Sequence, residues 1–218
     1  MTTNTSDQYY LNLKQNQIKM IKARGYDTSS EDWILDDNIT GKKFRRNLLK
    51  KYKDDYPSDY PIRKLMYSEY KKPNTKPLFV YFIGLEGGKQ IKVESVRPFI
   101  SKMTEEDKNG LLIIDSILSP EASKCLNYVT ESKYQIFKEE ELSFDLISSM
   151  MVPKHEIVED ASKLKLKYGI SSKGLPIIPS SDAVARYYHF MPGQLICITT
   201  ETDADLINNY STECCIVV

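Results

Sequence analysis

The chain has 218 residues, of which 41% are hydrophobic and 28% charged, so it can bury one large core or two small ones. Its 30 basic and 30 acidic residues balance, which argues against a protein that coats nucleic acid through bulk charge. No apolar run is long enough for a membrane-spanning helix, and the polar N-terminus lacks the apolar stretch of a secretory signal. The chain is therefore expected to be intracellular.

Residues 1–8 are expected to form a loose tail, and residues 9–24 a helix that ends at Gly25. Ser29 is then expected to cap a short helix that buries Trp33, the only tryptophan. Residues 27–76 are otherwise hard to interpret, because four prolines between residues 57 and 77 mark irregular connections.

A second helix is indicated after Thr40-Gly41 by the four-residue spacing of Phe44, Leu48 and Tyr52. Its other faces carry basic residues and no acidic one: Lys42, Lys43, Arg45, Arg46, Lys50, Lys51 and Lys53. A phosphate-facing surface and an ordinary solvated helix face both fit this pattern, and the solvated face is the more common case.

From Pro77 the pattern predicts an α/β layer. Residues 78–84 (LFVYFIG) are predicted to form a strand, Gly87-Gly88 a turn, and residues 90–96 (QIKVESV) the second strand of a hairpin. A helix is predicted over 97–109 with Pro98 in its first turn, followed by a buried strand at 111–115 (LLIID). Ser119-Pro120-Glu121-Ala122 has the pattern of a helix start, and residues 134–137 are a further strand candidate.

The pattern changes again near residues 147–153, which predicts two domains, 1–147 and 148–218. In the second domain, residues 158–168 are predicted to form a helix, and Asp182 to cap a short helix over 183–188. Residues 195–200 and the terminal CCIVV are predicted to be strands, which gives a small α+β module. Asp182 and Arg186, four residues apart, are in the favourable order for a helical ion pair.

The four cysteines, Cys125, Cys197, Cys214 and Cys215, contain no C-x-x-C pair, and the only histidines are His155 and His189. Neither a metal site nor a disulfide framework is expected, and no cofactor is predicted; buried reduced thiols are the predicted state. The last four residues formally fit a C-a-a-X lipidation motif on Cys215, but Val218 is an atypical final residue, and a buried strand is the favoured interpretation.

An enzymatic reading rests on Gln90-x-Lys92, which resembles the (Glu/Gln)-x-Lys element of restriction-type nucleases. That chemistry needs a carboxylate on the preceding strand to hold a divalent metal. The preceding strand has no acidic residue, and Glu86 lies in the turn, so a Mg²⁺-dependent nuclease is kept only as the alternative to a non-enzyme. His155-Glu156 does not begin an H-E-x-x-H motif, because residue 159 is Glu.

Short motifs in residues 150–194 resemble, in order and spacing, the assembly domain of the fifth subunit common to eukaryotic nuclear RNA polymerases I, II and III, a family with archaeal members. They are Val-Pro-x-His at 152–155, Leu-Pro-x-Ile at 175–178, Ser-Asp-x-Val-Ala-Arg-Tyr at 181–187 and Gly-Gln at 193–194. Arg24-Gly25-Tyr26, LFVYF, Ile91-Lys92-Val93, LLIID and Ser119-Pro120-x-Ala also follow the family's order. The resemblance runs from about residue 9 to the end, but residues 27–76 match poorly.

The resemblance implies a non-catalytic subunit with an α/β jaw domain, related in fold to restriction nucleases but without their active site, and a small α+β assembly domain. In this family the jaw domain forms part of the lower jaw near downstream DNA, and the assembly domain docks on the largest subunit. Carried over, the DNA-facing jaw loop is Ser119, Pro120 and Ala122. The assembly residues are Pro153, His155, Leu175, Pro176, Asp182, Arg186, Tyr187, Gly193 and Gln194.

The chain departs from the family at Ile177, where the family has Arg, and at Ala183, where it has Pro. Glu121 would oppose a phosphate in the jaw loop. This divergence and the Lys, Asn, Tyr and Ile usage favour a copy from a large cytoplasmic DNA virus, located in the virion and host cytoplasm; a protist subunit in the nucleus is the alternative. The expected partners are the largest and other polymerase subunits and downstream duplex DNA, bound weakly and without sequence preference, with no membrane.

Overall fold

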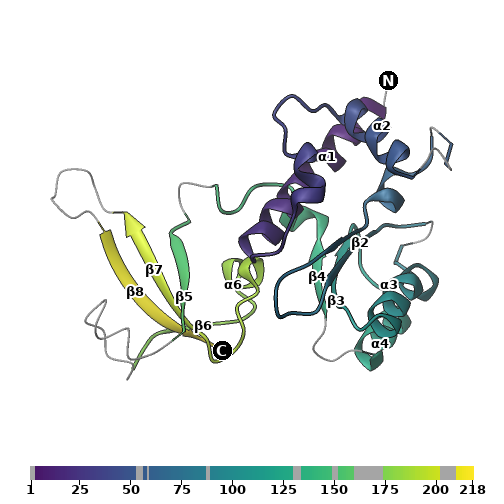
Figure 1. Cartoon of the computed structure of the whole chain (residues 1–218). Helices are drawn as coiled ribbons and strands as arrows, with labels where there is room; N and C mark the ends of the chain where they lie inside the picture. Colours follow the sequence, from purple (N-terminus) through teal and green to yellow (C-terminus); the bar gives the residue numbers. More distant parts are fainter. Residues whose placement is uncertain are drawn as a thin grey trace. The chain divides into compact units, whose positions relative to one another are not determined.

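The computed structural model describes residues 3–52, 56–57, 59–86, 89–129, 134–148, 152–159, 174–201 and 210–218. The chain divides into two compact units, Met1–Phe144 and Asp145–Val218. Each unit has a four-stranded sheet of its own (Figure 1). Within the described ranges, no helix combines the length and the apolar character that crossing a bilayer requires.

The sheet of the N-terminal unit has the strand order β1-β2-β3-β4. β1 (Ser68–Tyr70) runs antiparallel to β2 (Leu78–Ile83), whereas β3 (Asn109–Ile114) and β4 (Tyr134–Lys138) extend the sheet in parallel. Nearly every residue of β2 and β3 is buried, as expected for central strands whose two faces are both covered. The predicted strands at 78–84, 111–115 and 134–137 are confirmed within a residue or two.

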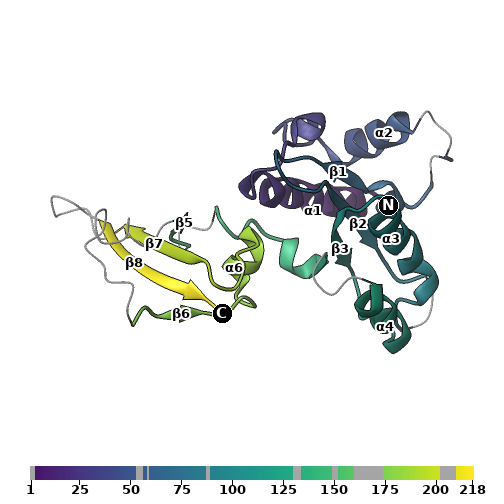
Figure 2. The same cartoon turned by 60° about the horizontal axis from the view of Figure 1, so that its bottom comes forward.

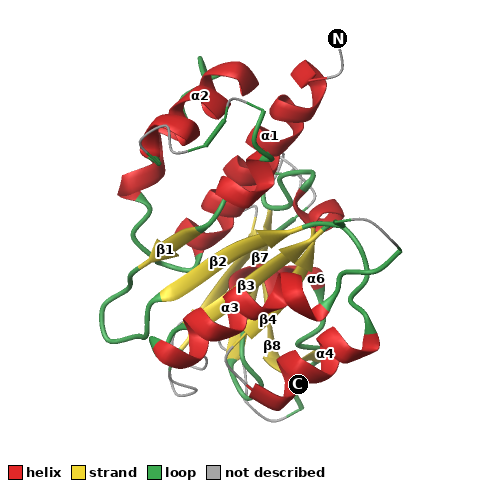
Figure 3. Ribbon diagram, turned by 90° about the vertical axis from the view of Figure 1, so that its right-hand side faces the viewer, coloured by secondary structure: helices red, strands yellow, loops and turns green. Residues whose placement is uncertain are grey.

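Successive residues of β2 and β3 face opposite sides of the sheet. On one side, Phe79 and Leu112 pack in a core with α3 (Val93–Glu105) and α4 (Pro120–Val129). On the other side lies α1 (Thr3–Ala23), whose Lys14 ammonium is 5.9 Å from the ring centroid of Phe82. Figure 3 shows α1 and α2 on one side of the sheet and α3 and α4 on the other.

α2 (Gly41–Lys51) packs against α1 and buries Phe44 and Leu48, as its spacing predicts. Gly41 permits a close approach, because a Cβ there would lie 2.5 Å from the backbone nitrogen of Gln8. The side chain of Thr40 caps the helix by accepting a hydrogen bond from the Lys43 N–H. The described part of the unit also contains short 3-10 helices: η1 (Ser29–Ile34), η2 (Ile62–Leu65) and η3 (Glu139–Leu142).

The predicted hairpin after residue 77 is wrong. Ile91 forms only an isolated bridge, with Leu118, and α3 already begins at Val93, so Pro98 lies inside the helix and not in its first turn. The antiparallel partner of β2 is β1, which precedes it. The predicted Gly87-Gly88 turn lies outside the described residues.

Two expectations near the N-terminus are also wrong. The predicted loose tail is helical from Thr3, because Asp7 forms an ion pair with Arg45 and the Gln8 side chain accepts a bond from the Gly41 N–H. In η1 the buried side chains are Glu31 and Ile34, whereas Trp33 is only half-buried and its ring lies tilted against Phe44, with 6.1 Å between the ring centroids.

The sheet of the C-terminal unit has the order β5-β7-β8-β6, and Figure 2 shows its two long strands side by side. β5 (Lys154–Val158) and β8 (Tyr210–Val217) flank β7 (Leu195–Glu201) in antiparallel fashion, and β6 (Ile177–Ile178) runs parallel to β8. One face packs on α6 (Ala183–Tyr188) through a core that includes Ala185, Phe190, Ile196, Cys215 and Val217.

The predicted strands at 195–200 and at the C-terminus, and the short helix after Asp182, are confirmed. Val158 ends β5 and does not start a helix; the rest of the predicted helix at 158–168 lies outside the described residues, apart from Glu159. β5 and β6 were not expected from the sequence, because both are short and acquire their pairing from strands distant in the chain.

Candidate functional site

The loop before α3 lies against the start of α4. The Ile91 N–H donates to the Ile117 carbonyl, and the Ser119 N–H donates to the Ile91 carbonyl, each over 2.9 Å. Next to these bonds is a groove of about 590 Å³, lined by Lys89, Gln90, Lys92, Val93, Glu94, Ser119 and Glu121. The structure thus brings together the Gln90-x-Lys92 element and the expected jaw loop, which are about thirty residues apart in the sequence.

The start of α4 is capped as its sequence predicts. The Ser119 hydroxyl accepts a bond from the Ala122 N–H over 3.2 Å, and Pro120 has no N–H to satisfy. Within the described part of the chain, Glu121 therefore carries the first-turn N–H that neither the cap nor the helix binds. This N–H and the positive end of the helix dipole favour an anion at the groove.

The three jaw-loop residues differ in exposure. Pro120 is exposed, Ser119 is buried by its capping role, and Ala122 is fully buried in the core with Leu126. Ala122 therefore anchors α4, while Pro120 and Glu121 present side chains to solvent. Across the groove, the exposed Lys89 and Lys92 offset the carboxylates of Glu94 and Glu121, so the groove has no strong net charge.

The candidate basic face of α2 is a separate surface. Lys42, Lys43, Arg46 and Lys50 are exposed. Arg45 instead turns inward: it bonds both carboxylate oxygens of Asp7 at 2.8 and 2.6 Å and the Tyr60 carbonyl at 2.9 Å, and the bonds to Asp7 raise its pKa. Figures 1 and 3 show α2 and α4 at opposite ends of the N-terminal unit, so the two surfaces do not form one footprint.

Arg63 joins the loops at the carboxyl ends of the parallel strands. Its guanidinium pairs with Asp115, directly after β3, at 3.0 Å and with Glu139, directly after β4, at 2.8 Å. The Asp115 carboxylate also accepts the Leu85 N–H at 3.1 Å. Gly84, directly after β2, leaves room for this pairing, because a Cβ there would lie 1.8 Å from Arg63 Nη1 and the guanidinium would have to shift. This clamp fixes the start of the loop that leads to Lys92.

The carboxylates of the clamp stabilise the charged form of Arg63. Burial opposes the charge on Arg63, but its bonds to Glu139 outweigh burial and raise the pKa of the guanidinium. Burial and the neighbouring Glu139 carboxylate raise the pKa of Tyr9, whose hydroxyl donates to Glu139, to about 12. Sequence reasoning missed this clamp; the available signal was that Asp115 and Glu139 each follow a strand, where parallel sheets place polar groups together.

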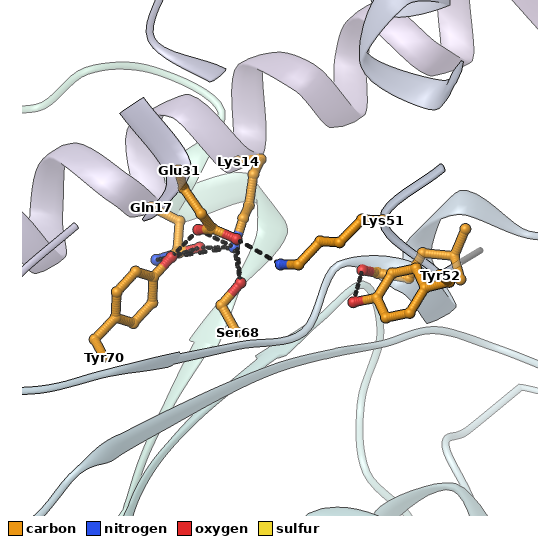
Figure 4. A network of polar contacts seen from close by, with 8 residues as sticks. Lys14, Gln17, Glu31, Lys51, Tyr52, Ser68 and Tyr70 are labelled. Atoms are coloured by element: carbon orange, nitrogen blue, oxygen red, sulfur yellow. Dashed lines mark hydrogen bonds and ion pairs between the residues drawn. The ribbon is translucent and has the colours of Figure 1, made fainter. Parts of the chain in front are cut away.

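A second polar cluster that sequence reasoning missed is buried beneath α1 (Figure 4). The Lys14 ammonium lies 3.1 Å from the Glu31 carboxylate and donates to Gln17 and Ser68, each at 2.8 Å. The hydroxyls of Ser68 and Tyr70 both donate to Glu31. Burial alone would raise the pKa of Glu31, but Lys14 and the two hydroxyls outweigh it and lower the pKa to about 2. The cluster fastens α1, η1 and β1 together.

The nuclease alternative loses its geometric basis. Gln90 and Lys92 lie in a loop and not on a strand paired with β2, so the hairpin that would align Lys92 with a metal-holding carboxylate is absent from the described residues. Among the same residues, no group of three His, Cys, Asp or Glu side chains is close enough to hold a metal ion.

The motif residues of the C-terminal unit form its caps and turns. The Asp182 carboxylate accepts the N–H groups of Val184 and Ala185 at 2.9 and 3.1 Å and so caps α6. Gly193 has a φ of 89°, which a glycine tolerates, and the Gln194 side chain closes the same turn by accepting the Met191 N–H at 2.7 Å.

The remaining motif residues have similar structural roles. A His155 ring nitrogen lies 2.7 Å from the Pro153 carbonyl, and the Pro176 carbonyl accepts the Ile216 N–H at 2.9 Å. Leu175 packs beside Cys197. Tyr187 is buried and Arg186 half-buried.

The expectation of reduced thiols throughout is wrong for one pair. The register of β7 and β8 places Cys197 opposite Cys214 with 4.1 Å between their Cα atoms, and the two form a disulfide. Cys125 and Cys215 are free thiols. Cys215 lies buried in the core beneath α6, where burial raises its thiol pKa, so this site does not present the thiol for lipidation.

Residues 144–206 match the family described as RNA polymerase Rpb5, C-terminal domain. DNA-directed RNA polymerase V subunit 5A of Arabidopsis thaliana is 26% identical over 90% of this chain and 83% of its own length. DNA-directed RNA polymerases IV and V subunit 5B of the same plant is 27% identical over 88% and 82%. The subunit rpabc1 of RNA polymerases I, II and III from Dictyostelium discoideum is 24% identical over 73% and 84%.

These matches define the chain first as a relative of subunits of DNA-directed RNA polymerases. More specifically, residues 144–206 match the model of the Rpb5 C-terminal domain family, and two of the relatives are named as fifth subunits. The relationship predicted from the motifs is therefore confirmed. A viral origin stays a prediction, because these matches do not bear on it.

Proposed function

We propose that the chain is a non-catalytic subunit of a multisubunit DNA-dependent RNA polymerase whose active site lies in other subunits. The observation that carries this proposal is the Rpb5 C-terminal domain match, joined by fifth-subunit relatives that align with 88–90% of the chain and so include both units. The corresponding location is the nucleus for a cellular subunit, or the virion and host cytoplasm for a viral copy.

The proposal assigns docking on the largest subunit to the C-terminal unit. Because the motif residues there serve as caps and turns, direct contact is better supplied by exposed apolar side chains: Ile157, Ile177, Met191 and Val218. Ile177 is 67% exposed and occupies the position where the family has Arg, so an apolar contact replaces a charged one at this point.

Co-expression with the largest polymerase subunit tests the docking assignment. Ile177→Glu is expected to reduce co-purification at least about tenfold, because burying an unpaired charge in an interface costs more than about 1.4 kcal/mol. Ser211→Glu, which adds the same charge at an exposed position of β8, is the matched control. Recovery of the largest subunit by residues 1–144 and not by residues 145–218 would show that the roles of the two units are reversed.

For the N-terminal unit we propose a place in the lower jaw, with an α/β layer related to restriction nucleases but without their active site. Contact with downstream duplex DNA would come from Lys89, Lys92 and the free N–H of Glu121, with the basic face of α2 as a second candidate. Each neutralised phosphate adds roughly 0.9 to the salt slope, so two or three contacts give a shallow dependence and a Kd of about 10⁻⁴–10⁻⁶ M.

Fluorescence anisotropy with several unrelated duplexes at two salt concentrations tests this proposal. Lys92→Ala is expected to make the salt slope shallower by about 0.9, and Glu121→Lys to strengthen binding because it removes a carboxylate that repels phosphate. If both variants bound DNA as the natural chain does, and Lys42→Ala/Lys50→Ala lost DNA binding, the contact would be assigned to α2. Nanomolar binding to one sequence at high salt would show an independent DNA reader. Mg²⁺-dependent cleavage that Lys92→Ala abolishes would show a nuclease.

A further inference from the structure

A groove of about 440 Å³ beside α3 is lined by aromatic rings and a proline. Tyr67 comes just before β1, Phe79 and Tyr81 lie on β2, and Pro98 lies on α3. Ser101, Lys102 and Glu105 complete the lining. A neighbouring groove of about 560 Å³ also has Tyr81 and Pro98 in its lining, together with Pro61.

The rings of this groove are held in fixed positions. Phe79 stacks on Tyr81 with 5.8 Å between centroids and on Phe99 of the core with 6.1 Å. Tyr67, which is 38% exposed, packs against Phe79 at 6.5 Å and against Tyr52 at 5.3 Å. A rigid aromatic wall of this kind loses little conformational entropy when it binds a ligand.

Pro98 breaks a local rule. It occupies an interior position of α3, where proline removes a helical hydrogen bond and is costly, and its ring is exposed and not part of the core. Sequences tolerate such a choice most often at functional sites. The ring of Pro98 extends the apolar floor of the groove next to Tyr81. A role in binding would therefore explain a proline at this position, which the stability of the helix does not.

The charges of the groove select among ligands. Lys102 is already paired with Glu106 one turn further along the helix. Glu105 is exposed, and among the described residues it has no ion-pair partner. A free carboxylate repels the phosphates of a nucleic acid and attracts a basic side chain. The groove therefore complements a cationic peptide and not a single-stranded nucleic acid.

We propose that this groove binds an extended, proline-containing peptide segment with a basic residue beside its prolines. Aromatic-lined grooves take up such segments in the polyproline II conformation, which is already ordered before it binds. In this assignment Tyr67, Tyr81 and Pro98 contact the prolines, and Glu105 pairs with the basic residue. The proposal uses none of the residues assigned to DNA contact or to docking, so its failure leaves those assignments unaffected.

Fluorescence anisotropy with the full-length chain tests the proposal. The probe is a fluorescein-labelled peptide of Pro-Ala-Leu-Pro repeats with an arginine at each end. One comparison peptide has alanine in place of every proline, and a second has glutamate in place of every arginine. A labelled oligo(dT) strand tests whether the groove binds single-stranded nucleic acid instead. Glu105→Lys is expected to weaken binding of the probe about tenfold, or about 1.4 kcal/mol. Glu140→Lys, a charge reversal at an exposed site away from the groove, is the matched control and is expected to change nothing.

Pro98→Ala separates binding from folding. It is expected to raise the midpoint of thermal unfolding, because alanine suits a helix interior, and yet to weaken binding of the probe several-fold. Saturable binding that requires proline and arginine and responds to both variants supports the proposal. Three outcomes each overturn it: no saturation below about 1 mM, equal binding of the alanine peptide, or binding that the groove variants leave unchanged. Oligo(dT) binding that Glu105→Lys strengthens, without peptide binding, also overturns it.

Discussion

Glu31 illustrates how tertiary contacts decide the state of a single residue. It lies in the first turn of a short 3-10 helix, a position typical of exposed acidic residues, yet its side chain is only 3% exposed. Lys14 and the hydroxyls of Ser68 and Tyr70 compensate the cost of burying the carboxylate. None of these partners is adjacent in sequence, so no local pattern predicts them.

Acid should therefore weaken the N-terminal unit. The Glu31 carboxyl has an ordinary pKa of 4.5 and a pKa of about 2 in the folded chain, so it contributes stability that is fully present above the ordinary value and is lost as the pH falls through about 2. One pKa unit corresponds to about 1.4 kcal/mol, so we expect this shift to give a loss of about 3 kcal/mol. Urea unfolding between pH 7 and pH 2 measures this loss.

The control for the acid experiment is Lys14→Met/Glu31→Gln, which removes both charges and leaves no buried ion unpaired. This double variant is expected to show a smaller loss of stability on acidification. Equal acid sensitivity of the double variant and the natural chain would contradict the role assigned to Glu31.

Gly84→Ala is expected to destabilise the N-terminal unit by about 1–3 kcal/mol, because the added methyl group overlaps the Arg63 guanidinium. Arg63 must then leave Asp115 or Glu139, which loosens the loop that carries Lys92. A double-mutant cycle on chemical unfolding tests the cause: in an Arg63→Ala background, Gly84→Ala should cost much less. If the free-energy costs of Gly84→Ala and Arg63→Ala were additive, the overlap with Arg63 would not be the cause of the destabilisation.

Among the elements, those with a strong local pattern were predicted and those that depend on distant partners were not. Helix α1 before Gly25 and strands β2 and β3 follow from periodicity or continuous apolar runs. The segment at 90–96 was misassigned because Ile91 and Val93 alternate over too short a stretch; Val93, Val96, Phe99 and Met103 already follow helical spacing. β1 has only three residues and is defined by its pairing with β2.

The same distinction holds for the candidate site. The capping roles of Ser119 and Asp182 were predictable, because a cap is a local bond between close neighbours in sequence. The meeting of Lys92 with the start of α4, and the pairing of Arg63 with Asp115, were not, because they depend on how distant loops converge at one edge of the sheet.

The Ser119 cap gives a prediction for α4. Ser119→Ala is expected to cost the N-terminal unit about 1 kcal/mol by releasing the Ala122 N–H. Ser119→Asp keeps a capping oxygen and so the stability, but its charge is expected to weaken binding of duplex DNA. Thermal unfolding and anisotropy on the same samples separate the two effects. Stronger DNA binding by Ser119→Asp would rule out phosphate at this helix start.

At the scale of the whole molecule, each unit has its own sheet and its own core, so the two are expected to unfold in separate transitions. The buried Lys14–Glu31 pair belongs to the first unit and the disulfide to the second. Acid and reductant therefore act as independent probes of the two units.

Reductant is expected to lower only the transition of the C-terminal unit. Cys197 and Cys214 are 17 residues apart, and a loop of this size contributes roughly 3 kcal/mol to stability by restricting the unfolded chain. Cys197→Ser/Cys214→Ser should reproduce the effect without reductant, whereas Cys125→Ser in α4 should leave this transition unchanged. The nucleus is a reducing compartment in which protein disulfides are rare. A nuclear polymerase subunit must therefore fold and dock without the Cys197–Cys214 disulfide. Circular dichroism of residues 145–218 under reducing conditions tests this requirement. If the reduced fragment lost all its secondary structure, the proposal of a nuclear polymerase subunit would be contradicted.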